Sequence, residues 1–183
     1  HLHLLGRQFR ISMVQLPLDS TTARRFGYML KPWLTAAFAE RVKLPASASV
    51  VIIDTDEYLL IPGAIAAAAG QPLAQPYAYG VRWLSKICSG STADICPHDL
   101  SIAEAKTHYA IGVPYVLMAA DFAAVASRWF YYMQRVVERL GTNDILADQY
   151  AYALAAHAAK LPHKTSSMMV SNSFGNSEAW AVV

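Results

Sequence analysis

The feature that most constrains the fold of this chain is a run of β-branched apolar residues that ends abruptly in acids, Val50-Val51-Ile52-Ile53-Asp54-Thr55-Asp56-Glu57. Such a run predicts a buried strand that delivers acidic groups to the edge of a sheet. Because side chains alternate along an extended backbone, Asp54 and Asp56 would point to the same side. Two carboxylates placed in this way offer oxygen ligands to a hard divalent cation, with phosphates completing the shell. The pattern therefore predicts a site for nucleotide or phosphate chemistry.

Composition favours one folded domain without a nucleic-acid partner. The chain has 183 residues, of which 55% are hydrophobic, and this is enough for the core of one α/β domain. The formal net charge is only +2, from 15 basic and 13 acidic residues, and no dense block of Lys and Arg occurs in the sequence. We therefore expect neither nucleic acid nor an anionic membrane surface as a partner.

No stretch of the sequence reaches the roughly 18 to 20 apolar residues that a membrane-spanning helix needs. The nearest candidate, Ile61–Gly70, is short and is interrupted by Pro62 and Gly63. The sequence begins at His1 without a signal-like segment, so we expect a processed product or a piece of a longer protein, in which an anchor could lie upstream.

The two cysteines, Cys88 and Cys96, lie eight positions apart in a segment rich in Ser and Thr. This spacing is compatible with a disulfide in an oxidising lumen and with two buried thiols in the cytosol, and the sequence leaves both open. A zinc site would need His98 and a further His. We do not expect one, because the standard ligand spacing is missing.

The predicted elements alternate between strands and helices, as an α/β fold requires. One helix is predicted from Tyr28 to Val42, and a long one from Asp121, its N-cap, to Leu140, with Gly141 after its end. The other predicted elements are an early strand over 9–18, the acidic strand over 50–53, a short helix over 62–70, a strand over 76–81, a surface loop over 88–99, a strand over 111–118 and a last helix over 145–160. No repeat interrupts this order, so we expect a single domain over the whole chain.

Four blocks of sequence together resemble a known group of enzymes. The blocks are Phe26-Gly27-Tyr28-Met29-Leu30-Lys31-Pro32-Trp33-Leu34, Val51-Ile52-Ile53-Asp54-Thr55-Asp56, Ile111-Gly112-Val113-Pro114-Tyr115-Val116-Leu117 and Ala147-Asp148-Gln149-Tyr150-Ala151-Tyr152-Ala153-Leu154-Ala155-Ala156. In this order and at this spacing they resemble the plant and algal peptidyl-serine α-galactosyltransferases and the related hydroxyproline O-arabinosyltransferases. The resemblance covers roughly residues 24–164, and its specificity lies in the combination, since a two-acid motif alone is weak.

The resemblance implies a GT-A-like nucleotide-diphosphosugar transferase fold, with a mixed sheet flanked by helices. It also implies a metal-dependent, retaining transfer of galactose or arabinose from a UDP-sugar to Ser or hydroxyproline of a glycoprotein. Mn²⁺ or Mg²⁺ would be the cofactor, and the lumen of the Golgi or endoplasmic reticulum the location. The early nucleotide-binding strand of the family is not evident before residue 24, so the fold is expected to be incomplete at its N-terminal side.

The resemblance also assigns residues to the metal and the donor. Asp54, Asp56 and His163 are implied as metal ligands, with Asp54 nearer the ribose. Lys31, Asp54 and Lys164 are implied as contacts of the donor nucleotide and its phosphates. A metal held there would neutralise the charge that develops on the departing diphosphate.

Further residues are implied on the acceptor side. Gly112, Pro114 and Tyr115 are implied as substrate-binding residues. Asp148, at a position where relatives commonly carry Glu, is implied as the catalytic residue that orients the acceptor hydroxyl.

Structural explanations compete with these roles. Acids often end strands in turns without binding anything, and an acid such as Asp148 is favoured in the first turn of a helix by the helix dipole. A His after a helix, such as His163, often contacts carbonyl groups. The aromatic residues of the long helix, Trp129, Phe130, Tyr131 and Tyr132, are assigned to the core rather than to a sugar platform.

Two other functions remain open. A strand that ends in Asp-x-Asp is also typical of haloacid-dehalogenase-type phosphohydrolases, in which the first Asp is a nucleophile. That motif normally opens the domain, whereas about fifty residues precede it here. The other alternative is a catalytically silent glycosyltransferase-like module that binds sugars or partners.

Overall fold

The computed structural model describes residues 29–54, 66–77, 79–89, 95–141 and 144–166. The predicted strand over 9–18 and Asp56 lie outside these ranges, as does most of the predicted helix over 62–70. Residues 66–70, the described end of that segment, do not form a helix, so this part of the prediction is wrong. They form a turn in which the Gln71 amide donates to the carbonyl of Ala68, and Gly70 adopts a positive φ of 70°.

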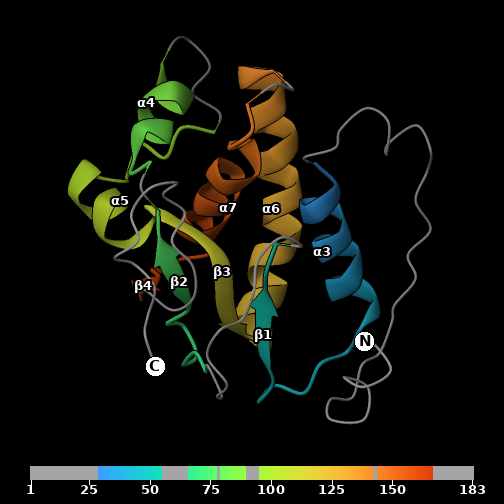
Figure 1. Cartoon of the computed structure of the whole chain (residues 1–183). Coiled ribbons are helices and arrows are strands. Elements are labelled where there is room, and N and C mark those ends of the chain that lie inside the picture. The colour runs from blue at the N-terminus through green and yellow to red at the C-terminus, as the bar shows by residue number, and fades with distance from the viewer. Residues whose placement is uncertain (1–28, 55–65, 78, 90–94, 142–143, 167–183) are drawn as a thin grey trace, which may run out of the picture.

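The described residues form an α/β fold around a four-stranded mixed sheet with the order β1-β3-β2-β4, which confirms the predicted α/β class (Figure 1). The strands are β1 (Ser49–Ile52), β2 (Leu73–Pro76), β3 (Ile111–Met118) and β4 (Lys164–Thr165). Strands β1 and β2 both pair antiparallel with the central β3, and β4 pairs parallel with β2. The acidic segment therefore follows a strand that lies at one edge of the described sheet.

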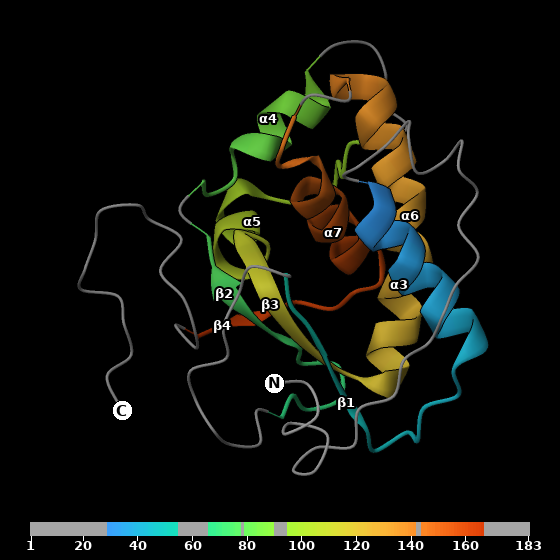
Figure 2. The ribbon, with the colours of Figure 1, turned by 45° about the vertical axis from the view of Figure 1, so that its right-hand side comes forward.

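Five helices accompany the sheet in the described residues. They are α3 (Leu30–Arg41), α4 (Arg82–Cys88), α5 (Ile102–His108), α6 (Ala119–Leu140) and α7 (Ala147–Ala158). Helices α6 and α7 run side by side, and α3 packs against α6, so that these three helices form a layer over the sheet (Figure 2). Pro32 lies in the first turn of α3, where its missing amide hydrogen is tolerated.

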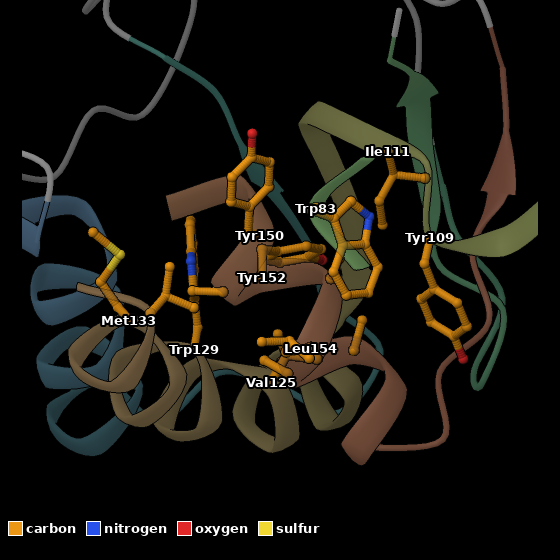
Figure 3. Close-up of a cluster of buried hydrophobic side chains, with 14 of the residues drawn as sticks. Trp83, Tyr109, Ile111, Val125, Trp129, Met133, Tyr150, Tyr152 and Leu154 are labelled. Carbon is orange, nitrogen blue, oxygen red and sulfur yellow. The ribbon is translucent and has the colours of Figure 1, made fainter. Parts of the chain in front are cut away.

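The core lies between this helical layer and β3. Helix α6 buries one stripe of residues at helical spacing: Phe122, Val125, Ala126, Trp129, Met133 and Val136. Helix α7 is buried on nearly every side, and Trp129, Tyr152 and Leu154 meet between the two helices (Figure 3). The core assignment is confirmed for Trp129 but is wrong for Tyr131, which is 47% exposed because it follows Trp129 by two residues and so faces away from the stripe.

The strand before the acids is less buried than predicted. Val51 and Ile53 are exposed, whereas Val50 and Ile52 pack against the core, so the strand is half-buried rather than buried. The reason is its position, because within the described residues β1 has a partner on one side only, β3.

Two short segments differ from the sequence-based prediction. The strand predicted over 76–81 is found at Leu73–Pro76, because the chain then turns, with the amide of Gly80 donating to the carbonyl of Tyr77. Helix α5 was not predicted, although Ser101 accepts a hydrogen bond from the amide of Glu104 and forms a normal N-cap.

The cysteines form a disulfide between Cys88 at the end of α4 and Cys96, which selects one of the two states that the sequence left open. Among the described helices, none combines the length and the apolar character needed to cross a membrane.

Candidate functional site

Three of the residues singled out from the sequence meet at one point. The ammonium nitrogen of Lys31 lies 2.5 Å from Oδ1 of Asp54 and 2.7 Å from Oδ2 of Asp148. The Asp148 side chain is only 10% exposed, and those of Lys31 and Asp54 are 27% and 31% exposed. We call these three residues the Lys31 cluster.

Each member of the Lys31 cluster comes from the end of a different element. Lys31 lies in the first turn of α3, Asp54 lies two residues beyond the end of β1, and Asp148 lies in the first turn of α7. The positive end of the α7 dipole favours the carboxylate of Asp148. The same effect disfavours the ammonium of Lys31 at the start of α3, so the two carboxylates must hold it there.

Burial and charge shift the proton affinities within the cluster. Burial raises the pKa of Asp148 above its ordinary value, and the Asp54 carboxylate raises it further, while Lys31 opposes both effects. For Lys31, burial has the largest single effect and lowers its pKa, but Asp148 and Asp54 together raise the pKa above its ordinary value. With the lysine charged and both carboxylates ionised, the cluster has one net negative charge.

Trp129 supports the cluster from the core. Its indole N–H donates a hydrogen bond of 2.7 Å to the backbone carbonyl of Asp148, and its ring centroid lies 5.9 Å from the ammonium nitrogen of Lys31. The contact ties α6 to the first turn of α7. It therefore fixes the backbone from which the Asp148 carboxylate projects.

Tyr115 lies in the core next to this group. Its ring stacks on Tyr152 with the centroids 3.5 Å apart, and it is fully buried. Burial raises its pKa well above the ordinary value, with smaller contributions from Tyr152, Asp148 and Asp54. Its hydroxyl makes no hydrogen bond to any part of the chain that the structure describes. A buried hydroxyl without a partner is costly, so a ligand group or a water that reached it would be stabilised.

Gly112 and Pro114 are buried in the central strand, and their surroundings explain why these two residue types occur there. A Cβ at Gly112 would overlap the ring of Tyr77, so only glycine allows this ring to lie on the strand. Pro114 lies where the pairing with β2 shifts register, between the Tyr115 pair and the Gly112 pair, and a residue without an amide hydrogen is tolerated there. Their role in substrate binding stays a prediction.

His163 and Lys164 are held by other contacts. The ring of His163 is fully buried, and its Nδ1 lies 3.0 Å from the carbonyl of Leu161. A carbonyl only accepts, so Nδ1 carries the hydrogen, and Nε2 accepts from the hydroxyl of Tyr152 at 2.9 Å. Burial lowers the pKa of His163 to about 4, which keeps the ring neutral. Lys164 is exposed on β4, and its amide donates to the carbonyl of Pro72.

The role of His163 as a metal ligand stays a prediction. To bind a metal, the ring would have to give up at least one of these two hydrogen bonds. Asp56, the other predicted ligand beside Asp54, lies outside the described residues. Within the described ranges no three His, Cys, Asp or Glu side chains gather as a metal site.

Two residues near the cluster were not singled out from the sequence. The pKa of Tyr77 is raised mainly by burial, which Gln149 partly opposes, with smaller raising contributions from Tyr79, Asp148 and Asp54. Tyr77 and Gln149 line a small, mostly aromatic pocket beside the start of α7. Gln149 could have been found from its position next to Asp148, whereas nothing local marks Tyr77.

The charges of the Lys31 cluster suit it to bind either a cation or an anion. Two carboxylates that already share one ammonium offer oxygen atoms to a hard cation, and the ammonium can neutralise an anionic ligand.

Comparisons of the chain with family models, with curated proteins and with solved structures found no match.

Proposed function

We propose that the chain is the donor-binding part of a metal-dependent glycosyltransferase. The reaction is the transfer of galactose or arabinose from a UDP-sugar to a Ser or hydroxyproline hydroxyl of a glycoprotein in the lumen of the secretory pathway. One observation supports the proposal most directly. Asp54 and Asp148, which come from two separate blocks of the sequence, bind the same ammonium group.

The residues fit a divalent cation. Asp54, with Asp56 outside the described residues, would hold Mn²⁺ or Mg²⁺, since carboxylate oxygens are the ligands that such ions prefer. The ammonium of Lys31 between Asp54 and Asp148 supports this fit, because it indicates that a positive charge is stabilised here. When bound, the ion would neutralise negative charge on the departing diphosphate.

Lys31 and Asp148 then act on the donor and on the acceptor, respectively. Lys31 contacts the donor diphosphate through charge-assisted hydrogen bonds. Asp148 accepts a hydrogen bond from the acceptor hydroxyl and orients it. The raised pKa of Asp148 means that its carboxylate takes up a proton more readily than an exposed one, which suits a group that handles a hydroxyl proton.

The test is calorimetric binding of UDP and UDP-galactose with and without MnCl₂, using Asp54→Asn and Asp148→Asn. Asp144→Asn is the matched control. Asp144 lies just before α7 and also pairs with a lysine, Lys86, at 2.9 Å, and asparagine keeps its hydrogen bond to the amide of Leu146.

The two variants should separate binding from transfer. Asp54→Asn should weaken Mn²⁺-dependent UDP binding by at least about tenfold, because one charged ligand is lost. Asp148→Asn should bind UDP but transfer little sugar to a peptide that contains Ser and hydroxyproline. Asp144→Asn should match the unmodified chain in both assays.

Absence of Mn²⁺-dependent UDP binding by the unmodified chain would contradict the proposal. Binding without transfer by the unmodified chain would instead identify the silent, sugar-binding module that the sequence left open.

A further inference from the structure

A second pocket lies at the opposite end of α7 from the Lys31 cluster. It has a volume of about 390 Å³ and is formed by α6, α7 and the segment before α5. Its wall includes Pro97, His98, Asp99, Tyr132, His157 and Lys160. Asp148 and His157 lie nine positions apart in the helix, a distance of about 14 Å along the axis. The pocket is therefore distinct from the candidate donor site.

Donors and acceptors alternate along the pocket wall. Oδ2 of Asp99 accepts a hydrogen bond of 3.3 Å from the ammonium of Lys160, and Oδ1 of Asp99 lies 3.6 Å from Nε2 of His157. His157 is 8% exposed, and its ring packs edge-on against Tyr109 with the centroids 5.5 Å apart. The imidazole is therefore held in place, while Asp99 and Lys160 remain open to solvent.

The backbone at the pocket rim is unusual. Lys160 has a φ of 58°, in the left-handed region that favours glycine. Its amide donates to the carbonyl of His157, and the next amide, that of Leu161, donates to Ala156, which is the standard end of a helix with glycine at this position. A lysine here is strained, and such strain is concentrated at functional positions. What the lysine adds over glycine is an ammonium group at the pocket.

The charges of the wall constrain the ligand. The hydrogen bond from Lys160 lowers the pKa of Asp99, so the carboxylate stays ionised beside the ammonium. Asp99 would repel an anionic ligand, and Lys160 would repel a cationic ligand. A neutral ligand with donors and acceptors on adjacent atoms satisfies both groups.

We propose that this pocket binds a neutral saccharide, with vicinal hydroxyls that donate to Asp99 and accept from Lys160. Pro97 and Tyr132 supply apolar surface for the C–H faces of a sugar ring. The volume falls in the range of small-molecule sites. Saccharide binding in this pocket does not require nucleotide binding at the Lys31 cluster. An experiment that refutes one of the two proposals therefore leaves the other unaffected.

The experiment is an NMR titration of the ¹⁵N-labelled chain with lactose and with methyl β-galactoside, and with inorganic phosphate as the anionic probe. The informative variant is Lys160→Gly, which removes the ammonium and relieves the strained backbone, so loss of binding cannot result from misfolding. Asp99→Ala removes the acceptor. Lys86→Ala, which removes an exposed ammonium at the other end of α7, is the control.

The expected result is a saccharide-dependent shift of the Asp99, His157 and Lys160 amides. The affinity should fall by about tenfold in Lys160→Gly and in Asp99→Ala and be unchanged in Lys86→Ala. Three results would each overturn the proposal: no shift with either sugar, shifts of these amides with phosphate alone, or sugar binding that both variants retain.

Discussion

Among single residues, Lys31 has the largest predicted effect on the candidate site, since its ammonium separates two carboxylates. We expect Lys31→Met to lower the free energy of unfolding at neutral pH by about 2 kcal/mol, less than for a fully buried pair because the cluster is partly exposed. Urea unfolding measures this loss. The loss should shrink in acid, because without Lys31 the pKa of Asp148 rises further and the native state binds a proton more readily than the unfolded chain.

Lys86→Met is the control for Lys31→Met. Lys86 pairs with Asp144 at 2.9 Å but has a side chain that is 47% exposed, so its removal should cost less than about 1 kcal/mol. Equal losses in the two variants, or a loss in Lys31→Met that is independent of pH, would contradict the description of the cluster as a coupled, partly buried group.

His163 makes stability depend on pH in the opposite direction. The folded ring titrates at about 4 and the unfolded one near 6.5, so the unfolded chain binds more protons in this window and stability is lost as the pH falls. Between neutral pH and about pH 5 the loss due to His163 should be about 2 kcal/mol. We expect this loss to be absent from His163→Gln, and urea unfolding at neutral pH and at about pH 5 measures it. A variant with the same pH dependence as the unmodified chain would refute it.

Some of these residues could be identified from sequence, and some of their contacts could not. Asp54 and Asp148 stood out because each has a local signature, a strand end and a first helical turn. The hydrogen bond at Nε2 of His163 depends on Tyr152, which reaches it only after the chain reverses at the end of α7. A lone histidine carries no sequence signal for such a partner, so its assignment as a ligand rested on the resemblance alone.

At the scale of elements, an indole hydrogen bond adds to the packing of α6 against α7. We expect Trp129→Phe to cost about 1 kcal/mol more than Trp83→Phe in urea unfolding, because it also removes the hydrogen bond from the indole to the carbonyl of Asp148. Trp83 is also buried, but its indole N–H has no partner among the described residues, so Trp83→Phe removes only ring volume. Equal costs would mean that the hydrogen bond does not hold the two helices.

The end of α7 offers the opposite case, a site where a substitution stabilises. Lys160→Gly should raise the free energy of unfolding by about 1 kcal/mol, because glycine adopts a positive φ without strain. Lys160→Ala removes the same ammonium but keeps the Cβ, and it should give no such gain. The melting temperatures of the two variants check this, and a higher value for alanine than for glycine would contradict the explanation.

Long, periodic elements could be predicted from sequence, whereas short ones could not. The prediction over 111–118 coincides with β3, and that over 121–140 lies within α6, because continuous burial and a helical stripe are strong signals. Helix α4 and helix α5 have only seven residues each and were missed. In α5 the N-cap at Ser101 is a usable signal, but about two turns of periodicity are too little to outweigh a Ser- and Pro-containing context.

At the scale of the whole molecule, the site depends on sheet order, which no local pattern encodes. The acidic segment reaches Lys31 because β1 pairs with β3, and β3 continues directly into α6, which packs against α3 and α7. The pairing of β1 with β3 and the packing of α3 against α6 are long-range contacts between segments of ordinary composition. The α/β class could be inferred from the alternation of elements, but the antiparallel pairing of β1 with β3 could not.

The disulfide links global stability to the second pocket. Replacing both Cys88 and Cys96 by Ser should lower the free energy of unfolding by about 2–3 kcal/mol, the loop-closure value for their eight-position separation. Cys96 also lines the pocket beside Asp99, so the same change should weaken saccharide binding. The Lys31 cluster contains neither cysteine, and nucleotide binding should persist at temperatures where the variant is folded. Urea unfolding and the two titrations measure these effects, and parallel loss of both ligands in the folded variant would show that the two ends of α7 are coupled rather than independent.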